Sequence, residues 1–440
     1  MALDLDWLLD EPVDSRFKGF PHGVAPMRLR DIGRQGWNVL RGDLPFPVAV
    51  ARRSAIERNS AWMREFTRSS GVRIAPHGKT TMCPQVFARQ IDDGAWGITV
   101  ANLRQLDLCV AIGVKRVLVA NQVLAPIDIA RLAALVGSDR ALEVFFLVDS
   151  IEQLALVDAE ARRHDLSRPL AALLEIGYEG GRTGVRSHAD AMKLARAVAA
   201  TRTVALAGLE CYEGLLVGDS DEDAARVERL LETVHRVAAA CDAERLFAAP
   251  EVILSAGGSA AFDIVARDLP LRLAKPVVTI LRSGCYITHD SGTYERLFER
   301  VRARSGEPWR SAPGLTPALE VWSQVQSRPE RGIAILTMGR RDVSFDSGLP
   351  RPIRWFHAPK EGWSAGNPSS ALLDAAPAGW EVVKLNDQHA YLRVPEDAKL
   401  EVGDLVGCGI SHPCTTFDKW QLVLEVDDDY TVVEGLRTFF

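Results

Sequence analysis

Between residues 71 and 281, the sequence alternates short apolar runs with longer amphipathic segments. Each run is nearly all apolar, as in parallel strands that are covered on both faces. The eight runs are 71–75, 95–100, 116–120, 142–148, 170–176, 204–210, 251–254 and 276–281, and helical patterns at 126–136, 151–163, 189–200 and 221–240 separate several of them. Eight consecutive strand–helix units predict an α/β fold with a (β/α)8 TIM-type barrel. A doubly wound open sheet is the alternative, but no GxGxxG follows the first run.

The rest of the chain predicts a second domain, because 440 residues are too many for one ordinary core. Beyond residue 300 the helical periodicity fades. Strand patterns at 318–327, 332–338, 380–383, 390–394 and 421–426 predict a mostly antiparallel β domain. The first 45 residues show few periodic elements, and we expect this arm to return to that domain. The predicted domains are a barrel of residues 46–290 and a discontinuous β domain of residues 1–45 and 291–440.

Composition and charge argue against several classes of protein. An apolar content of 47% with 25% charged residues is typical of a globular domain. The net charge of -6 argues against a nucleic-acid surface, and no apolar run is long enough to span a bilayer. The acidic N-terminal segment lacks the pattern of a signal peptide, and the seven cysteines lack CxxC spacing, which suits reduced thiols. We therefore expect a cytoplasmic protein that binds neither nucleic acid nor membrane.

A lysine follows the first apolar run, in the stretch Pro76-His77-Gly78-Lys79-Thr80. Active sites of TIM barrels lie at the carboxyl ends of the strands. The barrel prediction therefore places Lys79 at the barrel mouth, where its amine can serve as a nucleophile. Taken alone, a lysine after a strand is more often a solvated loop residue. Other polar residues follow later runs at equivalent positions: Asn102, Asn121, Asp149, Arg182, Tyr212, Arg282 and Tyr286.

Two adjacent glycines, Gly257 and Gly258, follow the seventh run and precede Ser259. Free backbone amides at the start of the next helix suit an anion, and glycine lets the backbone come close to it. Phosphate sites near strands seven and eight recur in TIM barrels. An ordinary tight turn explains the same residues without a ligand, but position and composition together favour phosphate.

A histidine and a cysteine stand two residues apart near the end of the chain, as His412-Pro413-Cys414. Imidazole and thiolate ligands together favour Zn²⁺, and two protein ligands leave positions open for water or substrate. A hydrogen-bonded histidine beside a buried cysteine is the commoner explanation of this spacing. Cys408 is a further candidate ligand, although its apolar surroundings favour a place in the core.

Together these motifs resemble the fold-type III enzymes that use pyridoxal 5'-phosphate (PLP), the alanine racemase-like group. Within that group the lysine motif resembles the D-serine dehydratase and D-threonine aldolase branch, and most of all bacterial D-serine deaminase-like proteins. Ala75 and the pair Thr81-Met82 depart from the commoner lysine motif, which is led by arginine and followed by histidine, and leave the substrate open. Matching segments follow in order at 175–185, 212–214, 257–259, 281–286, 339–350, 386–389 and 412–414.

The resemblance implies roles for single residues. It implies that Lys79 binds PLP covalently and removes the Cα proton of the substrate, and that His412 and Cys414 bind Zn²⁺. The aldolase branch commonly has a carboxylate at the position of Cys414, which favours elimination over aldol cleavage here. The other residues implied to contact the cofactor are His77, Arg182, Tyr212, Gly257, Gly258, Ser259 and Tyr286.

The expected reaction is PLP- and zinc-dependent dehydration of a D-3-hydroxy amino acid, with D-serine giving pyruvate and ammonia. A metal-dependent D-threonine aldolase is the alternative. A non-catalytic PLP-binding protein is a third possibility, against which the β domain counts. Relatives of fold type III are usually dimers, so the resemblance also implies a homodimer.

Overall fold

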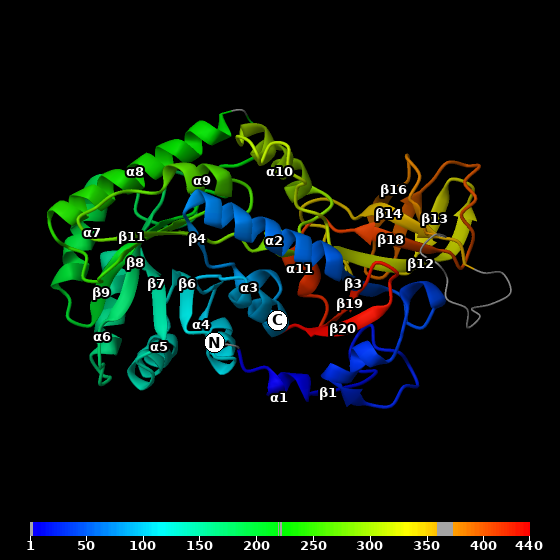
Figure 1. The fold of residues 1–440 in the computed structure, drawn as a ribbon, viewed down its shortest axis with the longest axis horizontal. Helices are drawn as coiled ribbons and strands as arrows, with labels where there is room; N and C mark the ends of the chain where they lie inside the picture. Colours follow the sequence, from blue (N-terminus) through cyan, green and yellow to red (C-terminus); the bar gives the residue numbers. More distant parts are fainter. Residues whose placement is uncertain (1–2, 219, 221, 359–372) are drawn as a thin grey trace.

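Two sheets organise the protein, one in each lobe of Figure 1. The computed structural model describes residues 3–218, 220, 222–358 and 373–440. The N-terminal arm and the C-terminal strands share one lobe, and the intervening residues build the other. Within these ranges, no helix has the length and apolar character needed to cross a membrane.

Eight parallel strands form the first sheet, in the spatial order β4-β11-β10-β9-β8-β7-β6-β5. Backbone hydrogen bonds from Trp96 to Ile74 and from Thr99 to Pro76 join the two ends of this order, so the sheet closes into a barrel. Each apolar run of the sequence contributes one strand, which confirms the predicted barrel. The strands are β4 (Arg73–Ile74), β5 (Ile98–Val100), β6 (Arg116–Gln122), β7 (Glu143–Val148), β8 (Leu170–Ile176), β9 (Val204–Cys211), β10 (Val252–Ala256) and β11 (Val277–Leu281).

Helices cover the outer face of the barrel (Figure 1). The side chains of Asn102, Ser150 and Ser187 cap three of them by accepting an amide hydrogen of the first turn. Asn102, one of the polar residues after the predicted strands, is thus used as a helix cap. The helices are α2 (Arg53–Ser70), α3 (Pro84–Asp92), α4 (Leu103–Ala111), α5 (Pro126–Ser138), α6 (Ile151–Ala161), α7 (His188–Ala200), α8 (Asp223–Ala243), α9 (Phe262–Asp268) and α10 (Thr293–Arg304).

The second sheet is mostly antiparallel, as predicted, and its main path runs β15-β14-β18-β12-β13-β17-β16. The strands β14, β15, β18 and β20 lie outside the five predicted strand patterns. The strands of this lobe are β12 (Leu319–Glu330), β13 (Ile333–Leu336), β14 (Arg351–Phe356), β15 (Leu373–Ala375), β16 (Glu381–Leu385), β17 (Ala390–Arg393), β18 (Leu405–Gly409), β19 (Leu422–Val426) and β20 (Val432–Arg437).

The strand β3 (Val48–Arg52) joins this second sheet, pairing antiparallel with β12 and parallel with β19. These residues fall inside the range 46–290 that the sequence assigned to the barrel. An apolar run of this length fits either sheet, and only its pairing decides between them. The division into two domains stays a prediction, with this difference at its first boundary.

The N-terminal arm packs against the second sheet. Leu29 and Ile32 of the arm belong to the same buried cluster as Trp322 of β12 and Leu424 of β19. The arm contains short elements where the sequence showed few periodic ones: α1 (Asp6–Leu9), β1 (Pro12–Val13), β2 (Met27–Arg28) and the 3-10 helices η1 (Leu29–Arg34) and η2 (Val39–Arg41). This packing supports the predicted return of the arm to the β domain.

Candidate active site

A cavity of about 250 Å³ opens at the carboxyl ends of the barrel strands. Five of the residues that were predicted to contact the cofactor line it: His77, Lys79, Arg182, Tyr212 and Gly258. The remaining lining residues are Ala101, Ala120, Asn121, Gln122, Leu147, Glu175, Thr183, Glu210 and Arg282. The barrel therefore gathers most of the candidate cofactor residues around one space.

Lys79 lies in the 3-10 helix η3 (Gly78–Thr80), which follows β4. A Cβ atom at Gly78 would lie 2.7 Å from the ring of Phe87, so glycine is needed for this close turn. The turn directs Lys79 to the cavity, and its side chain is exposed in the single chain. The amine is therefore accessible to a ligand that enters the cavity.

His77 lies at the wall of the cavity, and its buried Nδ1 atom has no hydrogen-bond partner within the described residues. Burial lowers the pKa of this imidazole well below its usual value, and the nearby cations Lys79, Arg282 and Arg182 lower it further. His77 is therefore neutral near pH 7. An unpaired buried nitrogen is costly unless a ligand or water completes its hydrogen bond.

Glu210 is a site residue that no sequence motif indicated. It lines the cavity from the end of β9 and forms a buried ion pair with Arg282, which also donates to the carbonyl of Cys211 at 2.8 Å. Burial raises the pKa of Glu210 to about 7, although the charge of Arg282 opposes this shift. A carboxylate within an otherwise apolar strand was the available signal, and Glu175 at the end of β8 shows the same pattern.

Arg182 and Tyr212, which were both predicted to contact the cofactor, lie together at the cavity. The guanidinium of Arg182 lies 5.0 Å from the centroid of the Tyr212 ring. Burial raises the pKa of the Tyr212 hydroxyl, so this phenol is neutral near pH 7. The pair presents one exposed cation and one partly buried aromatic ring to a ligand.

The predicted phosphate loop already holds a carboxylate in this structure. The amides of Gly257 and Gly258 donate to the buried Glu213 carboxylate at 3.1 and 2.5 Å. Gly257 has a φ of +92°, and a Cβ there would lie 2.7 Å from Leu281, so both conformation and space require glycine. The amides thus bind an anion, as the glycine pair suggested, but the anion is Glu213.

The other two residues predicted near the phosphate lie differently. Ser259 is partly buried and follows the two glycines. The side chain of Tyr286 is buried away from the cavity, where its hydroxyl accepts a hydrogen bond from Gln90 at 3.3 Å. The ring therefore lies among barrel side chains, which leaves only the Tyr286 backbone for the predicted phosphate contact.

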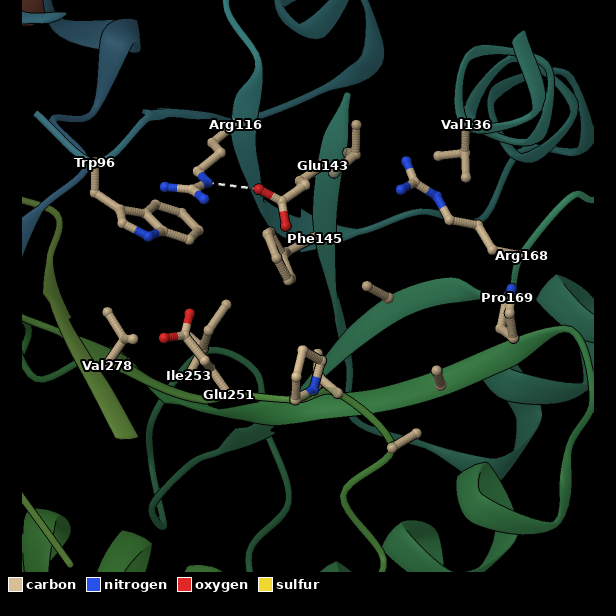
Figure 2. Close-up of a pocket in the computed structure, with 17 residues that line it drawn as sticks. Trp96, Arg116, Val136, Glu143, Phe145, Arg168, Pro169, Glu251, Ile253 and Val278 are labelled. Carbon is tan, nitrogen blue, oxygen red and sulfur yellow. Dashed lines mark hydrogen bonds and ion pairs between the residues drawn. The ribbon is translucent and has the colours of Figure 1, made fainter. Parts of the chain in front are cut away.

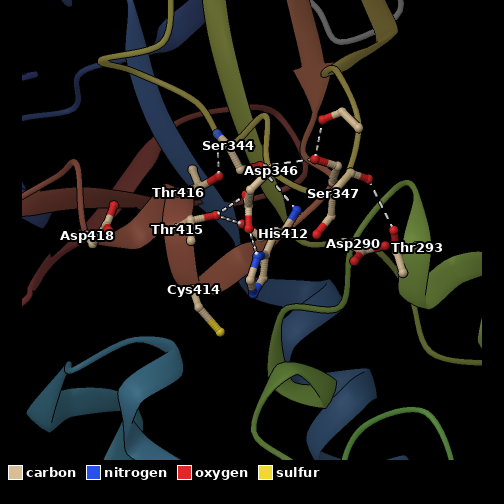
Figure 3. A network of polar contacts seen from close by, with 12 residues as sticks. Asp290, Thr293, Ser344, Asp346, Ser347, His412, Cys414, Thr415, Thr416 and Asp418 are labelled. Atoms are coloured by element: carbon tan, nitrogen blue, oxygen red, sulfur yellow. Dashed lines mark hydrogen bonds and ion pairs between the residues drawn. The ribbon is translucent and has the colours of Figure 1, made fainter. Parts of the chain in front are cut away.

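The candidate metal ligands lie at the start of α11 (Pro413–Phe417), with His412 just before it. Figure 3 shows Asp346, His412 and Cys414 close together in a network of polar side chains. The imidazole Nδ1 of His412 contacts the Asp346 carboxylate at 2.6 Å, and Thr415 donates to the same carboxylate at 2.7 Å. A carboxylate on one ring nitrogen is a common way to orient a metal-binding histidine, because it leaves the other nitrogen for the metal.

The Cys414 sulfur points to the lysine turn of the same chain. It lies 3.6 Å from Oγ1 of Thr80, the residue after Lys79, and 3.7 Å from the sulfur of Cys285. Cys285 begins the 3-10 helix η4 (Cys285–Ile287), which follows β11. The lysine motif and the His412–Cys414 motif are thus in contact within one chain. Cys408, the further candidate, is buried in β18.

The pKa values of His412 and Cys414 are shifted in opposite directions. The hydrogen bond from Cys285 lowers the pKa of the Cys414 thiol well below its usual value, and His412 lowers it further. The bond to Cys414 raises the pKa of His412 to about 9, and Asp346 also raises it. Cys414 is therefore a thiolate beside an imidazolium when no other cation is bound, which marks it as a ready ligand for a metal.

A larger cavity of about 460 Å³ lies at the opposite end of the barrel, around the starts of the strands (Figure 2). Its charged pair Arg116 and Glu143 is joined by a 2.5 Å ion pair, and Arg116 also lies over the Trp96 ring. Its lining includes no lysine, histidine or cysteine from the described part of the chain. The candidate nucleophile and metal ligands are thus confined to the other end of the barrel.

Relatives in sequence point to one group of enzymes. Residues 318–426 match the family model of the putative serine dehydratase domain. The chain is 28% identical over 315 residues to 3-hydroxy-D-aspartate aldolase of Paracoccus denitrificans (strain Pd 1222), a match over 70% of this chain and 75% of that one. It is 30% identical over 254 residues to D-threo-3-hydroxyaspartate dehydratase of Delftia sp. (strain HT23), covering 56% and 62%.

Solved structures agree with these relatives. D-threonine aldolase from Filomicrobium marinum superposes with a TM-score of 0.74 at 25% identity, over 94% of this chain and 98% of that one. An alanine racemase-like protein from Idiomarina loihiensis shares the fold, with a TM-score of 0.67 at 16% identity over 90% and 96%. The predicted resemblance is confirmed: the fold is alanine racemase-like, and the relatives carry the names of aldolases and dehydratases. The roles of single residues stay predictions.

Proposed function

From this fold and this kinship, we propose that the protein is a lyase that uses PLP and a metal ion to eliminate water from a D-3-hydroxy amino acid. D-Serine is the substrate proposed first, with pyruvate and ammonia as products. The contact between Cys414 and Thr80 carries the proposal, because it puts the predicted metal ligand Cys414 beside the turn that holds Lys79. Elimination needs a base at Cα and an acid at the β-oxygen, and the residues that we assign to these two roles belong to turns in contact with each other.

The cavity has features that suit PLP. The unpaired Nδ1 of His77 can form a hydrogen bond to a polar ligand. Lys79 and Arg182 present two exposed cations to the cavity, which favours a molecule that carries phosphate and carboxylate groups, whereas Arg282 is already paired with Glu210. PLP bound to Lys79 would supply the electron sink that a carbanion at Cα requires.

The residues of this chain would then have separate catalytic roles. We assign Lys79 to the removal of the Cα proton, and Arg182 with Tyr212 to the binding of cofactor or substrate carboxylate. His412 and Cys414 would hold Zn²⁺, a Lewis acid that assists departure of the β-hydroxyl group. Asp346 would keep the His412 ring in its binding orientation.

A D-threonine aldolase is the second candidate. Aldolase names occur both among the relatives in sequence and among the solved structures of similar fold. In that reaction the base takes the proton of the β-hydroxyl group, and the bond between Cα and Cβ breaks. The same lysine, cofactor site and metal ligands would serve both reactions, so the products must discriminate between them.

The decisive experiment supplies PLP, Zn²⁺ and a panel of D-serine, D-threonine and 3-hydroxy-D-aspartate. Keto acid with ammonia supports elimination, whereas glycine with an aldehyde supports the aldolase. Absence of both products for every substrate would overturn the proposal. Exhaustive metal removal should abolish turnover, and unchanged turnover would remove the metal from the mechanism.

The role of Lys79 has its own spectroscopic test. An absorbance band at about 410–420 nm is expected of PLP joined to a lysine. The band should vanish in Lys79→Ala and persist in the control Lys115→Ala, because Lys115 pairs with Asp139 on the barrel exterior. Survival of the band in Lys79→Ala would refute the assignment. We also propose a homodimer, which sedimentation of the holoprotein checks.

A further inference from the structure

Cys285 is a buried cysteine that the proposed mechanism leaves without a role. The backbone after β11 runs close to the lysine turn: a Cβ at Gly284 would lie 2.5 Å from the His77 carbonyl. This close approach brings the Cys285 sulfur to 3.9 Å from Oγ1 of Thr80. Because Cys414 contacts the same hydroxyl from the other lobe, both sulfurs meet at Thr80.

The distance between the two sulfurs fits two ligands of one metal ion as well as the hydrogen bond that joins them here. Sγ of Cys285 and Sγ of Cys414 are 3.7 Å apart. A disulfide bond requires about 2.05 Å. Two thiolates on one tetrahedral Zn²⁺ lie about 3.8 Å apart, since each Zn–S bond is about 2.3 Å long. The sulfurs therefore already have the spacing of two zinc ligands.

The third donor comes from His412, which stands two residues before Cys414. Its Nδ1 is held by Asp346, so the other ring nitrogen is the one left for a metal. In the described residues, no three His, Cys, Asp or Glu side chains already converge on one point. The sulfur pair is the preformed part of the site, and ligation would draw the imidazole toward it.

We propose that Cys285 is a third metal ligand, which with His412 and Cys414 forms a Cys₂His site for Zn²⁺. Three protein ligands and one open position are the pattern of catalytic zinc, and the open position receives the substrate hydroxyl. Two thiolates select Zn²⁺ over Mg²⁺, which prefers oxygen. Any proton still on a thiol is released to solvent when the metal binds. The inference rests on the proposed function and extends the predicted His412–Cys414 pair.

Cobalt titration of the full-length protein counts the thiolates. Bound Co²⁺ absorbs in the near ultraviolet through charge transfer from each thiolate ligand. We expect Cys285→Ala to halve this absorbance per bound Co²⁺ and to weaken Zn²⁺ binding, measured by calorimetry, by about 10- to 100-fold or more. The control is Cys241→Ala, which removes another buried thiol that contacts Met192 in the barrel wall and should change neither quantity.

Sulfur counting by X-ray absorption of the zinc-loaded wild-type protein needs no variant and serves if Cys285→Ala does not fold. Two sulfur neighbours support the proposal. One sulfur neighbour, or equal cobalt spectra for wild type and Cys285→Ala, would refute it while leaving the His412–Cys414 pair intact. A wild-type protein that binds neither Co²⁺ nor Zn²⁺ would overturn this inference and the metal role in the proposed function together.

Discussion

Replacing Glu213 by glutamine tests whether the amides after β10 bind the cofactor phosphate. The Glu213 carboxylate is buried and accepts the amide hydrogens of Gly257 and Gly258. Two like charges about 4 Å apart repel by about 4 kcal/mol at an effective dielectric constant of about 20. A phosphate can therefore reach these amides only if Glu213 turns away, and this change lowers cofactor affinity.

Glutamine keeps the shape of Glu213 and removes its charge. Its oxygen can still accept from one amide, but its NH₂ group faces the other amide hydrogen. The protein without PLP should lose about 2–3 kcal/mol of stability, because one charge-assisted hydrogen bond is lost and a buried amide is left unpaired. PLP affinity should rise by about tenfold or more, with a ceiling near the thousandfold that about 4 kcal/mol represents.

The assay titrates the PLP-free wild type and Glu213→Gln with PLP and follows absorbance, while urea unfolding reports stability. Pyridoxal, which lacks the phosphate, is the control ligand, and its affinity should be the same for both proteins. The reasoning fails if Glu213→Gln binds PLP as weakly as wild type or more weakly. In that case Glu213 only holds the loop of Gly257 and Gly258, and the phosphate binds elsewhere.

Three further substitutions test the site and the barrel. Glu210→Gln removes a carboxyl whose pKa is raised from the usual 4.5 to about 7 in the folded protein. Between these pH values the folded wild type binds a proton that the unfolded chain has lost, so its free energy of unfolding should fall by about 3 kcal/mol relative to the variant as pH rises. Urea unfolding at several pH values measures this difference. Asp346→Asn should weaken Zn²⁺ binding by about 10- to 100-fold in calorimetry, because His412 loses its orienting carboxylate, and an unchanged affinity would contradict that role. Gly208→Ala places a Cβ against the Ile253 carbonyl of the adjacent strand and should cost about 3 kcal/mol or more, seen as a lower thermal midpoint.

Much of the fold was predictable because its signals are local. Each barrel strand is a short apolar run, because a strand that is buried on both faces has apolar side chains at consecutive positions. The second sheet was harder. The strand β14 includes Arg351, Pro352 and Arg354 among its six residues, so its composition does not alternate, and the strand β3 is apolar enough to fit either sheet.

The candidate site was predictable to a different degree for each residue. Lys79, Arg182, Tyr212 and Gly258 follow strands of the barrel, and strand order alone places such residues at one mouth. The carboxylate of Glu213 was unforeseen, because nothing local shows that it reaches the amides after β10. A buried charge of this kind can be identified only from the groups that it contacts, and these are distant in the sequence.

The sequence by itself determined that this chain folds into a barrel with Lys79 at its mouth, since the hydrophobic pattern of each strand and helix lies in consecutive residues. The tertiary structure alone decided which distant groups surround the Lys79 turn. Cys285 follows the last barrel strand and Cys414 lies in the other lobe, yet both contact Thr80. Such contacts arise from the packing of one lobe against the other, and no local pattern encodes the distance between two sulfurs.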